Sequence, residues 1–527
     1  MCKWKARAER CANASAPSAV PPRHGVRVRK TIVKKTQGRQ NKIQIPCEPC
    51  CASTPAPGPA NFEEAMGDWA LANLNALRLL DPESHCRLRQ VLARGIDVTT
   101  HYSGTGTAEA AIATVAARIA DSHAMPACVA AVSCYSACDI SPVCQEVLEN
   151  HPVASRPLHR FSDLCARPPA ELVQRLRERL PGFQKKAGLR ASTPGGSKKH
   201  NWDRAASKHW VSFAMNLLSE WMPSRSSLAH CLRHGHLCAT YPPRTGRYHL
   251  EVSGVNCQPW SQAGQCWGWL DDRSIPCLIL VRIILAVEPD GVCIECTPRF
   301  DFQTLRALLQ PSYTGDFAIT SPADFGLPID RGRLYMWFDR RSAVSSATRP
   351  MSDIRETCRT QQLSLDVFLR ASPEEVQMYY HKLLGSLRSG SPVLRRRAVV
   401  GKVCLEDVLC AGNWTRYRRY RELIASLPDA PCYVVDVHKT PEYGAKPRSR
   451  RMPTLLRSSV LVVLCRPPAE DRLLLPTELP ALHGLEIAPG LLSRLPAADV
   501  RSLVGNSMHM VQVGVFVQFA LGTRVLR

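Results

Sequence analysis

One cysteine lies in a setting that would suit covalent catalysis. Cys257 stands in a loop that contains glycine, proline and serine, just after a short apolar stretch at residues 250–252. Farther along, Glu295 stands near the end of an apolar stretch, and Arg331 and Arg333 precede another. A thiolate, a carboxyl group and two guanidinium groups at neighbouring sheet ends could form and stabilise a covalent adduct. Taken alone, one cysteine among 23 is more often a small buried apolar residue.

A second group of residues could hold a ligand at the turns that follow strands. Tyr-Ser-Gly-Thr-Gly at residues 102–106 follows an apolar stretch, and its glycines would let the backbone approach a bound molecule. Asp139 ends the next apolar stretch, where an acidic residue commonly binds ribose hydroxyl groups. Asp163 follows a further short segment. Taken alone, the glycine segment is about as well explained as a plain tight turn, and each aspartate is more often a cap or turn residue.

Four potential metal ligands lie close together in the sequence. The segment contains Cys231, His234, His236 and Cys238, and thiolate with imidazole is a ligand set that binds zinc. Their spacing is tighter than that of a standard zinc finger, and the residues could equally belong to a loop. The sequence therefore predicts no metal site, and this cluster is kept as a weaker candidate for zinc.

A basic segment at residues 414–423 alternates aromatic residues with arginines. Trp414, Arg416, Arg418 and Arg419 could clamp phosphates and contact bases. A solvated helix face is the competing interpretation.

The composition is that of a globular protein with a strong excess of positive charge. The 527 residues include 68 Lys and Arg against 45 Asp and Glu, a net charge of +23. Phosphate binding to a basic surface releases counterions, so we expect a nucleic acid as partner. The polar, basic first residues argue against a signal peptide, and the scattered cysteines then predict free thiols. No stretch is long and apolar enough to span a membrane, so no membrane partner is expected.

Apolar strand-like segments alternate with helical segments, which predicts a parallel α/β sheet with helices on both faces. The expected strands are 97–102, 128–137 and 292–296, and the expected helices are 62–80, 108–119, 143–150 and 277–287.

In order and spacing, the motifs resemble those of the C5-cytosine methyltransferase family. The family's nucleophile motif, Pro-Cys-Gln-Pro-Phe-Ser, corresponds to Asn-Cys-Gln-Pro-Trp-Ser at residues 256–261. Its Glu-Asn-Val motif corresponds to residues 295–297, and its Gln-x-Arg-x-Arg motif to residues 329–333. Its Phe-x-Gly-x-Gly motif corresponds to residues 102–106, and its final Gly-Asn motif to residues 504–508.

The resemblance implies a Rossmann-like methyltransferase fold with a mixed, mostly parallel sheet and a smaller target-recognition domain. Residues 1–60, with their twelve Lys and Arg against two Glu, are predicted to be a disordered basic arm. The catalytic domain would span residues 61–340, with an insertion or lid at about 165–250. The recognition domain would span residues 341–469, and residues 470–527 would return to the catalytic domain.

The resemblance also implies a role for each site residue. Cys257 would attack C6 of cytosine, Glu295 would bond the N3 side of the ring, and the two arginines would hold O2 and shape the loop. S-adenosylmethionine would be the methyl donor. Its binding residues would be Tyr102, Ser103, Gly104, Thr105, Gly106, Asp139, Ile140, Asp163, Leu164, Asn506 and Ser507. Residues Gln258, Ser261 and Arg273 of the nucleophile loop would contact the nucleic acid, which would present a flipped base.

Four of the departures from the family pattern bear on how the site is positioned. Asn256 replaces proline, Cys296 replaces asparagine, Ile329 replaces glutamine, and Thr107 stands where a third glycine is usual. These changes put the positioning of the loop and its supporting hydrogen bonds in question, because such groups set nucleophile geometry.

The function expected from the sequence is methylation of cytosine C5 in DNA. An RNA (tRNA) cytosine methyltransferase and a catalytically inactive nucleic-acid-binding relative are the alternatives. The basic run at residues 27–30 fits nuclear import, and an organelle is the other location considered.

Overall fold

The computed structural model describes most of the chain after the basic arm. The residues it describes are 66, 69–122, 132–189, 204–261, 264–357, 363–388, 402–427, 432–442, 451–456, 458–485 and 487–527. The predicted arm at residues 1–60 and its import signal lie outside these residues. None of the helices within the described ranges is long and apolar enough to cross a membrane.

A seven-stranded sheet forms the centre, in the order β3-β2-β1-β6-β7-β9-β8. Its strands are β1 (Ile96–His101), β2 (Val132–Cys138), β3 (His159–Phe161), β6 (Tyr248–Gly254), β7 (Gly291–Cys296), β8 (Tyr313–Thr320) and β9 (Arg333–Arg340). Neighbours are parallel from β3 to β7, and β9 is antiparallel to both β7 and β8. The predicted α/β class, with a mixed and mostly parallel sheet, is therefore confirmed.

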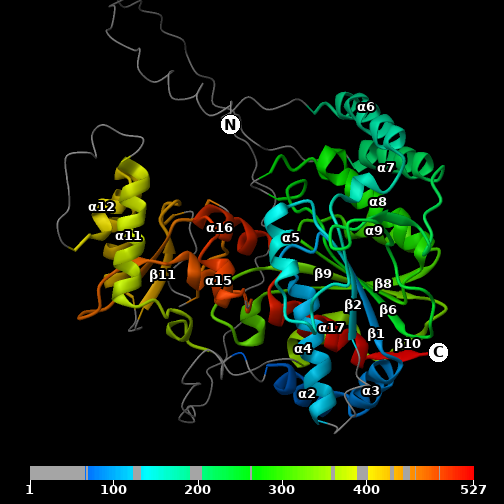
Figure 1. Cartoon of the computed structure of the whole chain (residues 1–527), viewed down its shortest axis with the longest axis horizontal. Helices are drawn as coiled ribbons and strands as arrows, with labels where there is room; N and C mark the ends of the chain where they lie inside the picture. Colours follow the sequence, from blue (N-terminus) through cyan, green and yellow to red (C-terminus); the bar gives the residue numbers. More distant parts are fainter. Residues whose placement is uncertain are drawn as a thin grey trace, which may run out of the picture. The chain divides into compact units, whose positions relative to one another are not determined.

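Helices cover both faces of this sheet (Figure 1). One layer consists of α2 (Trp69–Leu80), α3 (Ser84–Arg94), α4 (Thr107–Ser122), α5 (Pro142–Glu149) and α17 (Met510–Gly522). The other consists of α6 (Ala170–Lys186), α7 (Arg204–Leu218), α8 (Ile275–Val287) and α9 (Phe302–Leu309). Helices α8 and α17 are apolar on nearly every side, as expected of helices enclosed by sheet and neighbours.

The segment expected to be an insertion or lid is partly built into the second layer. Helix α7 buries Trp210 and Leu218 completely, in the same apolar cluster as α8. Because these side chains belong to the core, α7 cannot serve as a mobile lid. The segment continues into a hairpin of β4 (Leu228–His230) and β5 (Leu237–Ala239), and ends where the central strand β6 begins.

A smaller antiparallel sheet, in the order β11-β12-β13, lies within the predicted recognition domain. Its strands are β11 (Cys432–Asp436), β12 (Leu461–Cys465) and β13 (Arg472–Leu473), and they pack with α11 (Pro373–Arg388), α12 (Leu405–Val408) and α13 (Ala411–Ala425). This small core runs from Val376 to Leu475. The residues just after 340 lie elsewhere, because β10 (Val344–Ala347) pairs with the C-terminal strand β14 (Arg524–Leu526).

Candidate functional site

The predicted site residues meet at the carboxyl edge of the large sheet. Strand order reverses between β1 and β6, and in open α/β sheets ligands bind at such a switch point. The glycine turn follows β1, and the nucleophile loop follows β6. The carboxyl end of β7 delivers Glu295, and antiparallel pairing brings the start of β9, with Arg333, to the same edge.

Local contacts hold the loop that carries Cys257. The Asn256 side chain accepts a hydrogen bond from the Gln258 backbone at 3.0 Å. This turn restrains the loop in the position where the related family has proline. Trp260 is buried, with its ring centroid 4.5 Å from that of Phe300. Asn256 and Trp260 therefore restrain the loop on either side of Cys257.

Glu295 and Arg333 form an ion pair beside the nucleophile loop, with 2.9 Å between Oε1 and Nε. Glu295 is 7% exposed. Burial raises the pKa of Glu295, and the positive charges of Arg333 and Arg331 partly offset this effect. A carboxyl group with a raised pKa is suited to sharing a proton with a ring nitrogen.

Arg331 is buried and only partly paired. Its Nη2 donates to the backbone carbonyl of Gly505 at 3.2 Å and to that of Ser507. Its Nε and Nη1 are buried without a hydrogen-bond partner among the described residues. Buried donors without an acceptor are costly, so two unpaired guanidinium donors point to a ligand or water that accepts from them.

The charges at this edge act on the thiol of Cys257. Burial raises the pKa of Cys257, whereas the positive charge of Arg333, and then that of Arg331, lowers it. The carboxylate of Glu295 raises it. The two arginines thus oppose desolvation and favour the thiolate, which is the nucleophilic form.

The glycine turn after β1 has the backbone geometry of a ligand-binding loop. Tyr102, Gly104 and Gly106 have φ angles of 54°, 57° and 73°. A Cβ atom at Gly104 would meet nothing within 4 Å, so open space lies in front of the turn. A Cβ atom at Gly106 would lie 2.5 Å from the His151 ring, so this position requires glycine. A small cavity, with about 10 Å³ of water-accessible space, adjoins the turn.

The acidic residues after β2 and β3 cap their own turns. Asp139 accepts from the backbone of Gly104 and of Ser141, each at 2.8 Å. Asp163 accepts from the Cys165 backbone at 2.8 Å. An ionised carboxylate has about four acceptor positions, so Asp139 can still accept from ribose hydroxyl groups. Ile140 is 71% exposed beside it, and an apolar side chain placed there could cover an adenine.

The C-terminal motif closes the same cavity. Asn506, Ser507 and Met508 line it together with the glycine turn. The hydroxyl groups of Thr105 and Ser507 are 2.8 Å apart, which joins two predicted cofactor segments distant in sequence. Leu164 is buried in the turn after β3. The open turn, the free acceptor capacity of Asp139 and the exposed Ile140 fit the adenosine and methionine parts of S-adenosylmethionine.

Two departures from the family pattern have a clear structural setting. Cys296 is fully buried, and its Sγ lies 3.7 Å from the carbonyl oxygen of Val255, two residues before the nucleophile. Ile329 is also fully buried and pairs through its backbone with Met452. Both side chains occupy core positions, so the apolar replacements suit their surroundings.

The predicted nucleic-acid contacts divide into two groups. In the nucleophile loop, Arg273 donates to Gln258 at 2.5 Å and to Asp271 at 2.7 Å, and the Ser261 hydroxyl accepts from a backbone amide at 3.2 Å. These hydrogen bonds hold the three residues in place within the loop and the turn that follows it.

In α13 the interleaved aromatic residues pack rather than stand free. Trp414 stacks on Tyr417 against the small core, with ring centroids 4.7 Å apart. Arg416 donates to the Val437 carbonyl at 2.6 Å, and Arg419 pairs with Glu442. Contacts within the protein therefore account for the placement of Trp414, Arg416 and Arg419. Arg418 is exposed.

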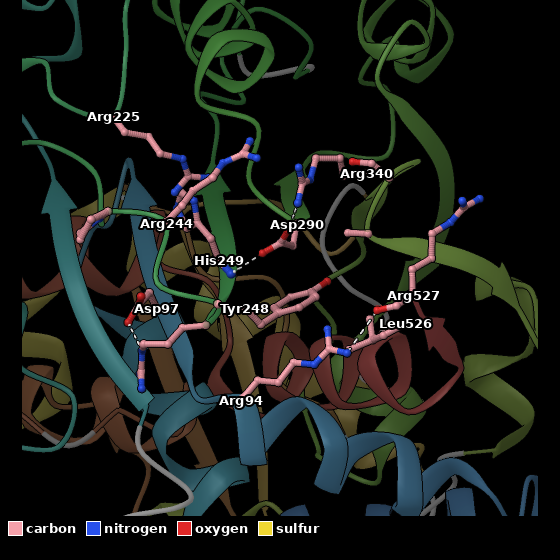
Figure 2. A pocket seen from close by; sticks show the side chains of 15 residues that line it. Arg94, Asp97, Arg225, Arg244, Tyr248, His249, Asp290, Arg340, Leu526 and Arg527 are labelled. Carbon is pink, nitrogen blue, oxygen red and sulfur yellow. Dashed lines mark hydrogen bonds and ion pairs between the residues drawn. The ribbon is translucent and has the colours of Figure 1, made fainter.

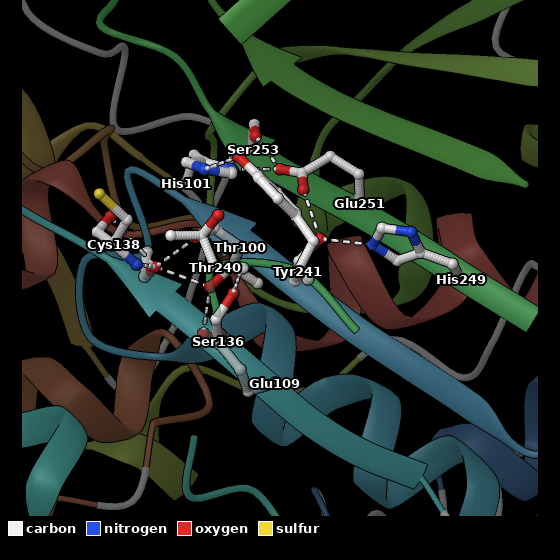
Figure 3. Close-up of polar contacts among 12 residues, drawn as sticks. Thr100, His101, Glu109, Ser136, Cys138, Thr240, Tyr241, His249, Glu251 and Ser253 are labelled. Carbon is white, nitrogen blue, oxygen red and sulfur yellow. Dashed lines mark hydrogen bonds and ion pairs between the residues drawn. The ribbon is translucent and has the colours of Figure 1, made fainter. Parts of the chain in front are cut away.

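Two sets of buried polar contacts near the glycine turn match no motif in the sequence (Figure 3). Glu251 on β6 accepts from Thr99 at 2.5 Å and from Ser253 at 2.7 Å, and pairs with His101 at 2.7 Å. Glu109 accepts from Thr100 at 2.5 Å, and burial raises the pKa of Glu109 to about 7. The signal in the sequence is the polar run Thr-Thr-His inside a fully buried strand.

A larger cavity, of about 250 Å³ of water-accessible space, opens at the opposite edge of the sheet (Figure 2). Its lining arginines are Arg94, Arg225, Arg244, Arg247, Arg340 and Arg527. Arg247 forms an ion pair with Asp97 at 2.7 Å, and Arg340 forms one with Asp290. This cavity surrounds the amino ends of β1, β6 and β7 and is separate from the predicted reaction site.

No family model matches the chain. Over 97 residues, 17% of the chain, it is 29% identical to the type II methyltransferase M.NgoBI of Neisseria gonorrhoeae. Over 104 residues, 18% of the chain, it is 33% identical to the type II methyltransferase M1.ScrFI of Lactococcus lactis subsp. cremoris. A third match, over 97 residues and 17% of the chain, is 30% identical to the type II methyltransferase M.NlaX of Neisseria lactamica.

The first two matches span 31% and 27% of those curated relatives, so the chain covers less than a third of their length. Among solved structures, the chain is similar to the S. pombe Dnmt2 methyltransferase, with a TM-score of 0.43 and 14% identity. That similarity covers 81% of this chain and 98% of the other.

Proposed function

We propose that this protein transfers a methyl group from S-adenosylmethionine to C5 of cytosine in DNA, with Cys257 as the covalent nucleophile. The observation that carries the proposal is the convergence at one sheet edge of four features. They are the capped Cys257 loop, the Glu295–Arg333 ion pair, the unpaired donors of Arg331 and the open glycine turn.

The donor would be held by residues from four segments and would supply an electrophilic methyl group. The backbone of Tyr102 and Gly104 would face its methionine part. Asp139 would accept from its ribose, and Asp163 would face its adenine. Asn506 and Ser507 would close the cavity.

The chain's own residues would perform the remaining steps. The Cys257 thiolate forms a bond to C6 of a flipped cytosine, and the electron pair displaced from the C5–C6 double bond makes C5 nucleophilic. Glu295 shares its proton with N3, and the unpaired donors of Arg331 bond O2, which offsets the charge on the ring. Once C5 is methylated, its proton passes to water, and the electron pair of that C–H bond restores the C5–C6 double bond as the thiolate leaves C6. N3 then returns its proton to Glu295.

A methyl-transfer assay separates this proposal from its alternatives. The full-length chain is incubated with S-adenosylmethionine labelled in the methyl group, and with either duplex DNA or tRNA. Label recovered as 5-methylcytosine from the duplex supports the proposal. Label in tRNA alone would assign the chain to RNA. Donor binding without transfer to either would indicate the inactive binding protein.

We favour DNA as the substrate because the chain carries a net charge of +23 over 527 residues and has a basic N-terminal segment. We also propose a nuclear location on the basic run at residues 27–30. A fluorescent fusion of the full chain, compared with one in which that run is replaced by alanine, would test the location.

A further inference from the structure

Four metal-ligating side chains meet beside the edge strand β3, away from the proposed nucleophile. Their ligand atoms lie within 4.8 Å of one another. We propose that the protein binds a zinc ion through His159, Cys231, His234 and Cys238. This inference is independent of the proposed function, because it needs neither the methyl donor nor a nucleic acid.

The distances between ligand atoms suit a tetrahedral metal site. Nδ1 of His234 lies 3.5 Å from Sγ of Cys231 and 3.3 Å from Sγ of Cys238. With zinc–nitrogen and zinc–sulfur bonds of about 2.0 and 2.3 Å, neighbouring ligand atoms are roughly 3.3 to 3.8 Å apart. Two thiolates and two imidazoles form a ligand set typical of structural zinc.

The β4–β5 hairpin builds three of the four ligand positions. The amide of Cys231 donates to the His236 carbonyl at 2.9 Å, and the amide of Gly235 donates back to Cys231 at 2.9 Å. Gly235 has a φ of 70°, which permits the tight turn. These bonds bring the two cysteines at the ends of the turn, and His234 within it, towards one point.

Strand β3 supplies the fourth ligand and is already joined to the hairpin. The amide of Leu232 donates to the Arg160 carbonyl at 2.7 Å, and Arg233 donates to the Pro157 carbonyl at 2.6 Å. Nδ1 of His159 is buried and has no hydrogen-bond partner among the described residues. His159 and His234 meet edge to face, with ring centroids 5.1 Å apart.

The structure corrects the ligand set considered from the sequence. His236 is exposed, and its Nδ1 is engaged with the His234 carbonyl at 2.9 Å. It does not belong to the cluster, whereas His159, more than seventy residues earlier in the chain, does. His236 therefore provides a matched control within the same hairpin.

Zinc at this point would fasten the hairpin to the strand that leads to Asp163. Binding would replace the two thiol protons of Cys231 and Cys238, which pass to solvent, and two thiolates would balance the charge of the ion. Because β3 ends just before the turn of Asp163, the ion would stabilise one wall of the proposed donor site without taking part in the reaction.

Metal analysis of the purified full-length chain tests this inference. The protein is expressed with zinc, kept reduced, and dialysed before its zinc content is measured by mass spectrometry. We expect about one zinc ion per chain. His159→Gln and Cys238→Ser should each lose most of it, whereas His236→Gln should retain it. Cobalt substituted for zinc should show the visible absorption of a tetrahedral site with thiolate ligands.

Several results would overturn the inference. They are wild-type protein without stoichiometric zinc, equal loss of zinc in the His236 and His159 variants, or a cobalt spectrum without thiolate charge transfer. A disulfide between the two cysteines under reducing conditions would also contradict it. If a ligand variant fails to fold, the cobalt spectrum of the wild-type protein still decides. None of these readouts depends on methyl transfer, so a failed methylation assay leaves this test intact.

Discussion

The pKa of the Cys257 thiol is raised by burial, and the neighbouring arginines oppose this effect. Of the two arginines, Arg333 has the larger influence. Glu295 forms a 2.9 Å ion pair with Arg333, and its carboxylate raises the pKa of Cys257. The ionisation of the nucleophile therefore depends on a balance between burial, which disfavours the thiolate, and the arginine charges, which favour it.

Removing the charge of Arg333 should move the reactivity of Cys257 to higher pH. In Arg333→Gln, alkylation of Cys257 by iodoacetamide should slow severalfold at neutral pH, because loss of the positive charge raises the pKa of the thiol and lowers the thiolate fraction. The reaction is followed by peptide mass spectrometry from pH 7 to 9. Arg333→Lys, which retains the charge, should keep the wild-type profile. An unchanged profile in the glutamine variant would contradict this role.

The turn at Asn256 should be replaceable by the proline that the related family carries. Asn256→Ala removes the 3.0 Å bond to the Gln258 amide, so the loop should loosen and the rate of methyl transfer should fall about tenfold. Asn256→Pro should preserve the rate, because the ring fixes the backbone. Thermal unfolding should differ little among the three proteins. Equal losses in both variants would refute this reading of the turn.

At the scale of elements, the buried contacts of Glu251 join β6 to β1, and the contact of Thr100 with Glu109 joins β1 to α4. Glu109 is 1% exposed, and its pKa is raised to about 7. In the unfolded chain this carboxyl has its ordinary, lower pKa, so between the two values the folded state binds more protons. The stability from this group is therefore present at low pH and declines as the pH rises through 7.

Glu109→Gln should remove this pH dependence. Between pH 5.5 and 8.5 the wild-type free energy of unfolding should fall by about 2 kcal/mol more than that of the variant. Denaturant unfolding at several pH values measures the difference. The exposed Glu171→Gln should follow the wild type. A constant difference between wild type and Glu109→Gln across this range would contradict the burial of an ionisable carboxyl.

The elements with a strong sequence pattern were predictable, and the contacts between distant elements were not. The apolar run before Pro289 indicated α8, and the following run indicated β7, because their periodicity and composition are local properties. Glu251 meets His101 only because β6 pairs with β1 across 150 residues. His159 joins the cysteine cluster for the same kind of reason.

Domain limits were also harder to predict than strands and helices. Residues 344–347 follow the main sheet closely in sequence, and they pair with the C-terminal strand rather than with the small core. The helix at residues 204–218 reads as polar and basic along one side, but Trp210 on its other side is fully buried. The pairing partner of a short strand and the buried face of a helix depend on tertiary packing, which local composition does not encode.

At the scale of the whole molecule, the net charge of +23 predicts strongly salt-dependent binding to duplex DNA. Raising salt from 50 to 200 mM should weaken binding by at least about 100-fold, because each phosphate contact releases counterions. If the exposed Arg418 contacts phosphate, Arg418→Ala should reduce the slope of the log–log salt plot by about one. Fluorescence anisotropy measures both. Binding that is insensitive to salt would contradict a phosphate-dominated interface.

The central claim is that Cys257 forms a covalent bond to the cytosine ring. The direct measurement is trapping on duplex DNA that contains 5-fluorocytosine, with S-adenosylmethionine present, because fluorine at C5 prevents the final elimination. We expect a denaturation-resistant protein–DNA complex with the wild-type chain and none with Cys257→Ser. A complex that persists in Cys257→Ser would contradict the assignment of the nucleophile. The absence of any complex from protein that binds both the donor and the duplex would contradict covalent catalysis on DNA.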